Sequence, residues 1–290
     1  MNKLFKHAFT LIELLVVIAI IGILSGLIVV SMGGMTTKAT IAKAQVFSNS
    51  LRNSLMLDLV AEYKLDGNAI DSWGGHTTGT ITGATPSSDC VQGACYSFNA
   101  ANSDIINLPY DADLKPTNEL TVSVWASMTS WTPADARMLS CTETGGYNIT
   151  LAPTSCYAAL SINGTYRTLY FYNTPPASGW HYFVFTYDGR YFKNYFDGSY
   201  KDQYDATAVY PIVYTYANNI IIGGEAGPGT GAVAGSYFTG KIDEIRFFKK
   251  GIAASQIKEQ YYAGINKLFI NGFISQEEYM SRVNSIAEAK

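Results

Sequence analysis

The pattern of hydrophobic and polar positions changes once along the chain. Residues 14–30 read LLVVIAIIGILSGLIVV without a charge, and lightly polar flanks extend this apolar segment over residues 9–35. At 1.5 Å per residue, a helix over 9–35 is roughly 40 Å long, enough to cross a hydrocarbon core of about 30 Å. We therefore predict a membrane-spanning helix there.

The helical pattern continues beyond the predicted membrane segment. Apolar residues recur at three- and four-residue spacing between polar ones, and no proline interrupts them: Ile41, Ala44, Phe47, Leu51, Leu55 and Leu59. We predict an exposed helical stem over 36–59. A stem that only spaces a receptor-like domain from the membrane is the alternative interpretation.

The positive charges of the N-terminus set the orientation of this helix. Lys3 and Lys6 precede the apolar run. By the positive-inside rule, the N-terminus stays in the cytoplasm and the rest of the chain is exported. The expected topology is a single pass.

From residue 60 the chain alternates in short runs punctuated by turn residues. Residues 120–126, 181–187 and 244–248 have the two-residue period of strands, and Asp197-Gly198 marks a hairpin turn. No helical pattern intervenes until about residue 252, so we predict an antiparallel β-sandwich over 60–264. The predicted fold class is α+β.

The last segment, 265–290, has the pattern of a short helical hairpin. Two helical stretches flank Asn271-Gly272. Ser275 is expected to cap the second helix, with Glu278 three residues later completing a capping box. We interpret this hairpin as a docking element or subunit contact.

Composition narrows the functional classes. Of 290 residues 48% are hydrophobic, which is too many for a disordered chain, and 20 Lys+Arg stand against 23 Asp+Glu. Because basic residues are not in excess, binding to nucleic acid through phosphate contacts is not expected.

The N-terminal string has a specific resemblance. Lys-His-Ala-Phe-Thr-Leu-Ile-Glu-Leu at residues 6–14 resembles the processing motif of type IV prepilins and type II secretion pseudopilins. The resemblance implies that residues 1–8 are a leader, which a prepilin peptidase removes between Ala8 and Phe9, and that Phe9 is then N-methylated. The residue before the cut is usually Gly in that family, and here it is Ala8.

The same resemblance gives Glu13 a role in assembly. A carboxylate inside an apolar helix costs on the order of 3 kcal/mol to insert. In the family the glutamate at this position pairs with the N-terminal amine of a neighbouring subunit. The implied partners are other pilin subunits and the pilus assembly platform. The implied location is the bacterial cytoplasmic membrane before assembly and a surface pilus or pseudopilus afterwards.

Several strings of the exported part resemble laminin-G-like, concanavalin A-type jelly rolls. They occur in family order at residues 60–67, 71–72, 96–99, 105–109, 120–125, 179–188 and 238–247. That fold hosts lectins, adhesive modules and glycosidases, so the fold alone does not choose among these functions.

The residues give little support to catalysis. A retaining glycosidase needs two carboxylates about 5 Å apart. Asp243 and Glu244 are adjacent in a predicted strand and are expected to point to opposite faces, which argues against hydrolysis. His7, His76 and His181 are scattered without metal-ligand spacing. We expect no enzyme.

The jelly-roll resemblance also implies a structural Ca²⁺ across the junction of the first and last strands. The matching positions are Asp66, Asn68, Asp71 and Asp243, which offer the oxygen ligands that Ca²⁺ prefers. The alternative is that Asp66 and Asp71 simply form turns. No other cofactor is expected.

Four cysteines lie on the exported side, where disulfides persist. Four cysteines allow three pairings. Proximity in the sequence favours Cys90 with Cys95 and Cys141 with Cys156.

The exported part is rich in tyrosine, with groups at 166–172, 191–204 and 210–216. Such rings stack on sugars or anchor a protein partner, and half of each alternation is expected to be core. We predict a type IV pilus or pseudopilus subunit, in a minor or tip position, that displays a lectin-like adhesive domain. The alternatives are a surface-anchored glycan-active enzyme and a membrane-anchored adhesin that never polymerises.

Overall fold

The fold is described from a computed structural model of the chain. The described residues are 11–12, 14–22, 57–128, 135–141, 145–172, 178–216, 218–228, 231–233 and 235–288. The chain divides into two compact units, residues 1–47 and residues 48–290.

The first unit is described only in part. Residues 11–12 and 14–22 are helical. Ala8, Phe9 and Glu13 lie outside the described residues, as does almost all of the predicted stem. Within the described ranges, no helix combines the length and hydropathy needed to cross a bilayer.

The second unit is built on two antiparallel sheets. The larger has eight strands in the order β13-β12-β11-β6-β17-β4-β3, with β1 paired to β17 beside this path. Its strands are β1 (Leu59–Tyr63), β3 (Thr85–Ser87), β4 (Cys95–Phe98), β6 (Leu120–Met128), β11 (Gly179–Tyr187), β12 (Tyr191–Phe196), β13 (Ser199–Asp205) and β17 (Gly240–Phe248).

The smaller sheet has seven strands in the order β10-β9-β8-β7-β14-β5-β2. They are β2 (Thr80–Thr82), β5 (Ile105–Leu108), β7 (Ala136–Ser140), β8 (Tyr147–Leu151), β9 (Cys156–Ile162), β10 (Thr165–Tyr172) and β14 (Ile220–Ile222). A short 3-10 helix, Ala100–Asn102, precedes β5, and β15 (Glu225–Ala226) pairs with β16 (Ala232–Val233) as a separate ribbon.

The two sheets face each other across one hydrophobic core. Inward residues alternate along the strands, as in Leu120, Val122 and Val124 of β6, which are completely buried. The β-sandwich predicted from the two-residue period is therefore confirmed. The predicted turn at Asp197-Gly198 joins β12 to β13.

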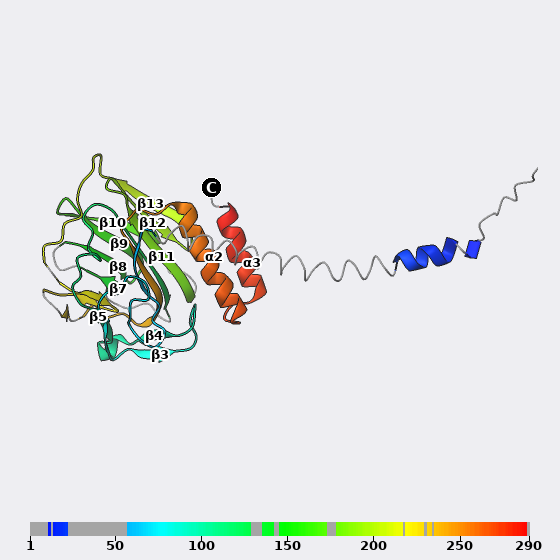
Figure 1. The fold of residues 1–290 in the computed structure, drawn as a ribbon, viewed down its shortest axis with the longest axis horizontal. Helices are drawn as coiled ribbons and strands as arrows, with labels where there is room; N and C mark the ends of the chain where they lie inside the picture. The colour runs from blue at the N-terminus through cyan, green and yellow to red at the C-terminus, as the bar shows by residue number, and fades with distance from the viewer. Residues whose placement is uncertain are drawn as a thin grey trace, which may run out of the picture. The chain divides into compact units, whose positions relative to one another are not determined.

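Two helices, α2 (Ala254–Ile270) and α3 (Gln276–Glu288), form a third layer. They cover the outer face of the eight-stranded sheet, on the side away from the seven-stranded sheet (Figure 1). The chain turns at Asn271-Gly272, as predicted, and the Ser275 hydroxyl accepts the Glu278 N–H at 3.1 Å, so the predicted cap is present. The hairpin docks within its own chain.

Candidate functional site

Strand β17 contains a β-bulge that brings two acidic residues to one side. Glu244 has φ +49°, and the register with β6 shifts between Asp243 and Arg246. Ile242 and Ile245 both enter the core, so Asp243 and Glu244 lie together between two inward residues. The expectation that these acids point to opposite faces was wrong, because a bulge interrupts the strand alternation.

Both acids of the bulge are nevertheless sealed from solvent. Asp243 is 0% and Glu244 3% exposed. Burial and the neighbouring Glu244 raise the pKa of Asp243 well above its ordinary value. A glycan in solution does not reach carboxylates buried in this way. Their burial, and not strand alternation, therefore argues against glycosidase chemistry at this pair.

Glu244 belongs to a buried ion-pair network. Arg246 binds both Glu244 and Glu62, the latter through Nε to Oε1 at 2.9 Å. Burial opposes ionisation of Glu62, yet Arg246 and a hydrogen bond from Ser72 hold the pKa of Glu62 below its ordinary value. This network joins β1 to β17, the first and last strands of the domain.

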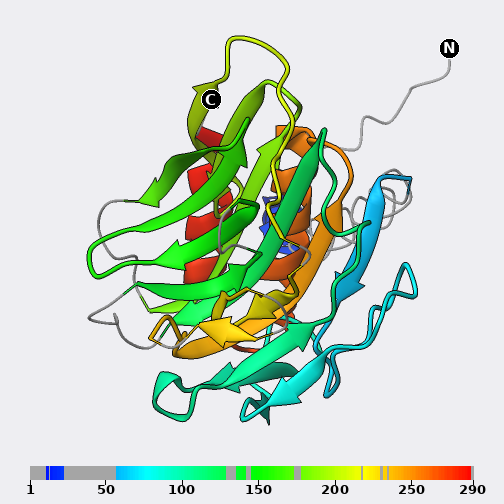
Figure 2. The same cartoon turned by 90° about the vertical axis from the view of Figure 1, so that its left-hand side faces the viewer.

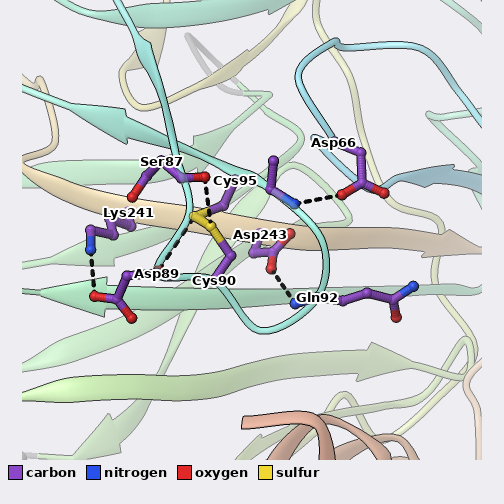
Figure 3. The surroundings of a disulfide bond; sticks show 9 residues. Asp66, Ser87, Asp89, Cys90, Gln92, Cys95, Lys241 and Asp243 are labelled. Atoms are coloured by element: carbon purple, nitrogen blue, oxygen red, sulfur yellow. Dashed lines mark hydrogen bonds and ion pairs between the residues drawn. A yellow bond between two sulfur atoms is a disulfide. The ribbon is translucent and has the colours of Figure 1, made fainter. Parts of the chain in front are cut away.

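A disulfide loop lies beside the bulge (Figure 3). Cys90 and Cys95 form the disulfide that was predicted. Two carboxylates hold the loop between them: Asp66 Oδ1 accepts the Ala94 N–H at 2.7 Å, and Asp243 Oδ2 accepts the Gln92 N–H at 3.0 Å. Asp66 and Asp243, which come from opposite ends of the domain sequence, therefore meet the same loop.

Asp243 leaves one polar atom unpaired. Its Oδ1 is buried and has no hydrogen-bond partner in the described part of the chain. A buried carboxylate oxygen in this state suits a cation. Of the four residues predicted for Ca²⁺, Asp243 has such an oxygen, and Asp66 contacts the same loop.

The other two residues predicted for Ca²⁺, Asp71 and Asn68, accept hydrogen bonds from backbone N–H groups. Asp71 accepts N–H groups of Glu62, Trp73, Gly74 and His76 at 2.9–3.1 Å, and its Oδ2 is 2.7 Å from His76 Nδ1. Despite burial, these hydrogen bonds hold the pKa of Asp71 below its ordinary value.

Asn68 closes a short turn by accepting the Ile70 N–H at 3.0 Å. The turn interpretation therefore fits Asn68 and Asp71 better than the calcium interpretation does.

The predicted disulfide between Cys141 and Cys156 is absent, and both residues are buried free thiols. Cys141 hydrogen-bonds to Tyr147, which pairs with Leu160 of β9, whereas Cys156 pairs with Leu151 at the other end of β8. The two thiols are thus separated by an intervening strand and by about 13 Å along it, at 3.3 Å per residue. A disulfide needs Cα atoms within about 7 Å.

One histidine is not scattered as the sequence indicated. His76 Nε2 lies 3.9 Å from Asp111 Oδ2 and 3.7 Å from Asp113 Oδ2. These residues come from different connections, 35 and 37 positions apart, so their spacing carries no metal-ligand signature. The sequence signal was limited to an Asp-x-Asp pair that follows residues 105–109, one of the strings of the jelly-roll resemblance.

A polar network also occupies the outer face of the seven-stranded sheet, which faces the viewer in Figure 2. Arg137 of β7 bonds to Thr150, to the Tyr157 hydroxyl at 3.3 Å and to Glu225 Oε1 at 3.1 Å. Its Nε is buried without a partner among the described residues. No sequence motif marks Arg137, because this residue reaches the face only through strand pairing.

Aromatic rings extend the same face. Tyr157 and Tyr170 from neighbouring strands lie with centroids 5.8 Å apart, and Tyr170 is 46% exposed. A guanidinium beside exposed tyrosine rings can hydrogen-bond and stack on a sugar.

Comparison with known families assigns this architecture. Residues 100–258 match the family model described as the concanavalin A-like lectin/glucanases superfamily. The chain belongs to this superfamily. Residues 5–29 match the prokaryotic N-terminal methylation motif. The sequence matches no curated protein.

Solved structures with this superfamily fold cover most of the chain. The binding domain of Paraclostridial Mosquitocidal Protein 1 is 13% identical with a TM-score of 0.60, covering 73% of this chain and 53% of that one. The receptor-binding domain of botulinum neurotoxin mosaic serotype C/D is 14% identical with a TM-score of 0.55, covering 73% and 52%. The chain thus spans about half the length of these two.

Domain 4 of AbnA, an extracellular arabinanase from Geobacillus stearothermophilus solved with arabinotriose, is 21% identical. Its TM-score is 0.51, and the match covers 70% of this chain and 97% of that domain. These identities establish the fold only. The methylation motif identifies a pilin-like or pseudopilin-like N-terminus, and the concanavalin A-like domain is suited to binding. This combination fits a non-enzymatic subunit.

Proposed function

We propose that this protein is a type IV pilus or pseudopilus subunit that displays a lectin-like binding domain outside the cell. The observation that supports the proposal is the presence of both a methylation motif, at residues 5–29, and a concanavalin A-like domain on one chain. In this proposal the precursor is held in the cytoplasmic membrane with its N-terminus inside. A prepilin peptidase cleaves it, and the assembly platform adds it to a surface filament.

We further propose a minor or tip position. A globular part of this size is large for a subunit repeated along a filament, whereas a tip position leaves the seven-stranded sheet free. Within the filament, Glu13 pairs with the methylated amine of Phe9 from a neighbouring subunit, because a carboxylate in an apolar helix needs a cation.

The processing step has a direct test. Mass spectrometry of the protein recovered from cells is expected to give a chain that begins at N-methylated Phe9. Glu13→Ala should be cleaved but excluded from filaments, while the neighbouring Leu14→Ala should enter them. An intact leader, or normal incorporation of Glu13→Ala, would overturn the assembly proposal.

We propose that the binding face is the outer face of the seven-stranded sheet around Arg137, Tyr157 and Tyr170, and that its ligand is a glycan. The partly exposed Tyr170 ring beside Tyr157 supports this choice, and Arg137 bonds to the Tyr157 hydroxyl and so fixes that ring. A surface protein is the other class of partner that these rings could anchor.

An oligosaccharide array that includes arabinotriose tests the face directly. Tyr170→Ala should lose binding to the oligosaccharides that the wild type retains. Tyr200→Ala is the matched control, because Tyr200 is 50% exposed on the other sheet. Equal loss in both variants, or no binding to any glycan by the wild type, would contradict the glycan face. Release of shorter sugars would instead support the enzyme alternative.

We also propose that Asp66 and Asp243 hold a structural Ca²⁺ together with backbone carbonyls near the disulfide loop. The unpartnered Oδ1 of Asp243 supports this assignment. The ion would neutralise a buried carboxylate and tie the first and last parts of the domain to one loop.

A further inference from the structure

We propose a second, separate metal site, in which His76, Asp111 and Asp113 bind a divalent transition-metal ion of the Zn²⁺ type. It goes beyond the proposed adhesive function and does not depend on it. The ion would link the connection between β1 and β2 to the connection between β5 and β6.

The three side chains converge on one point. His76 Nε2 lies 3.7 Å from Asp113 Oδ2 and 3.9 Å from Asp111 Oδ2, and the three ligand atoms all lie within 4.8 Å of one another. A tetrahedral ion with bonds of about 2.0–2.1 Å holds its ligand atoms roughly 3.3 Å apart. The two distances from His76 Nε2 are therefore about half an ångström longer than in a closed site. Asp113, whose side chain is 79% exposed, has room to move inward.

The outer nitrogen of His76 lies between two carboxylates without bonding to either. The His76 side chain is only 10% exposed, and both carboxylate oxygens lie beyond hydrogen-bond distance of Nε2. Among the described residues, Nε2 therefore has two acidic neighbours and no hydrogen-bond partner. An ion placed between the three side chains would bind all of them at once.

The other nitrogen is held in the orientation that a metal ligand needs. Nδ1 lies 2.7 Å from Asp71 Oδ2, and the Asp71 carboxylate, which also accepts several backbone N–H groups, is an acceptor only. When Nδ1 donates its proton to Asp71, the lone pair of the imidazole lies on Nε2, the nitrogen that faces the two carboxylates. Metal-binding histidines are commonly oriented by a carboxylate in this way.

The donor set selects the class of ion. One imidazole nitrogen and two carboxylates favour Zn²⁺ or a neighbouring first-row metal over Ca²⁺, which prefers oxygen ligands alone. With three protein ligands, a fourth position remains for water. Asp111 is already braced by accepting the Asp113 N–H at 2.9 Å, which fixes the Asp-x-Asp turn.

The test is a metal titration of the full chain in detergent, stripped with a chelator. Co²⁺, whose d–d absorption reports nitrogen and oxygen ligands, and Zn²⁺, followed by calorimetry, are expected to bind at one equivalent. His76→Gln should weaken binding at least about 100-fold, and Asp113→Asn about 10- to 100-fold, the scale seen when metal sites lose supporting groups. Zn²⁺ should raise the melting temperature of the wild type but not that of His76→Gln.

His181→Gln is the matched control. His181 also contacts a carboxylate, with Nδ1 2.7 Å from Asp197 Oδ2. The His181→Gln variant should bind the metal like the wild type. Asp113 is exposed, so Asp113→Asn keeps the test valid if His76→Gln misfolds. Failure of the folded wild type to bind Co²⁺ or Zn²⁺, or equal affinity in Asp113→Asn and the wild type, would overturn the site.

Discussion

The indole of Trp125 lies flat against the ring of Tyr261, with ring planes 6° apart and centroids 5.5 Å apart. Trp125 is on the outer face of β6 and Tyr261 is on α2, so this contact joins the helical hairpin to the sheet. The ring of Tyr182 also stacks on the Trp125 indole, with ring centroids 5.0 Å apart. The hairpin is held by aromatic packing.

Gly264 allows α2 to approach Trp125 so closely, and we predict that Gly264→Ala disrupts this contact. A Cβ at Gly264 would lie 2.1 Å from Trp125 Cζ2. Although alanine favours helix, overpacking should lower the free energy of unfolding by about 1–3 kcal/mol, as measured by denaturant titration. Gly231→Ala, where a Cβ meets nothing within 4 Å, should have little effect. Equal stability of both variants would contradict this packing.

The cysteine arrangement predicts a specific alkylation pattern. The native protein should react at no cysteine, because Cys141 and Cys156 are buried and Cys90 and Cys95 are bonded. Denatured without reductant, the chain should take up two alkyl groups, and after reduction four, as counted by mass spectrometry. If the denatured chain took up no alkyl group before reduction, Cys141 and Cys156 would be bonded to each other, contrary to the structure.

The Arg246 network predicts that the free energy of unfolding depends on pH in opposite ways in the wild type and in Arg246→Met. Because the folded pKa of Glu62 lies below its ordinary value of 4.5, its contribution is complete above that value and is lost as pH falls through the folded pKa. Arg246→Met leaves Glu62 and Glu244 buried without the guanidinium. It should cost about 3–5 kcal/mol at neutral pH, and less as acid protonates Glu62.

Lys267 of α2 also interacts electrostatically with these carboxylates and limits the effect. Denaturant titrations from pH 7 to below the folded pKa of Glu62 measure both curves. Arg190→Met, which breaks the exposed ion pair with Asp205, is the control and should follow the wild type. If the free energies of unfolding of Arg246→Met and the wild type changed with pH in parallel, the buried network would not be the cause of the pH dependence.

The calcium proposal predicts that Asp243→Asn abolishes stabilisation by Ca²⁺. The wild type should melt at a higher temperature in Ca²⁺ than in chelator. The variant should show no difference and, in chelator, be at least as stable as the wild type, because a neutral amide replaces a buried carboxylate of which one oxygen lacks a partner. Asp89→Asn changes an exposed carboxylate in the same loop and should retain the response. Persistence of the Ca²⁺ effect in Asp243→Asn would remove Asp243 from the site.

Residue order was sufficient for the features that depend on local pattern. Two-residue alternation identified the strands, Asp197-Gly198 the hairpin turn, and Ser275 the cap of α3, because each depends on neighbours along the chain. The methylation motif was likewise readable from consecutive residues. The short Cys90–Cys95 loop needed no knowledge of the fold.

The tertiary structure decided what depends on residues far apart in the chain. The bulge at Glu244 placed this residue on the same face as Asp243, and strand β8 separated Cys141 from Cys156. His76 met Asp111 and Asp113 only because two connections lie together at one end of the sandwich. A sequence specifies periodicity and local turns, whereas register, bulges and the packing of distant loops arise from the fold as a whole.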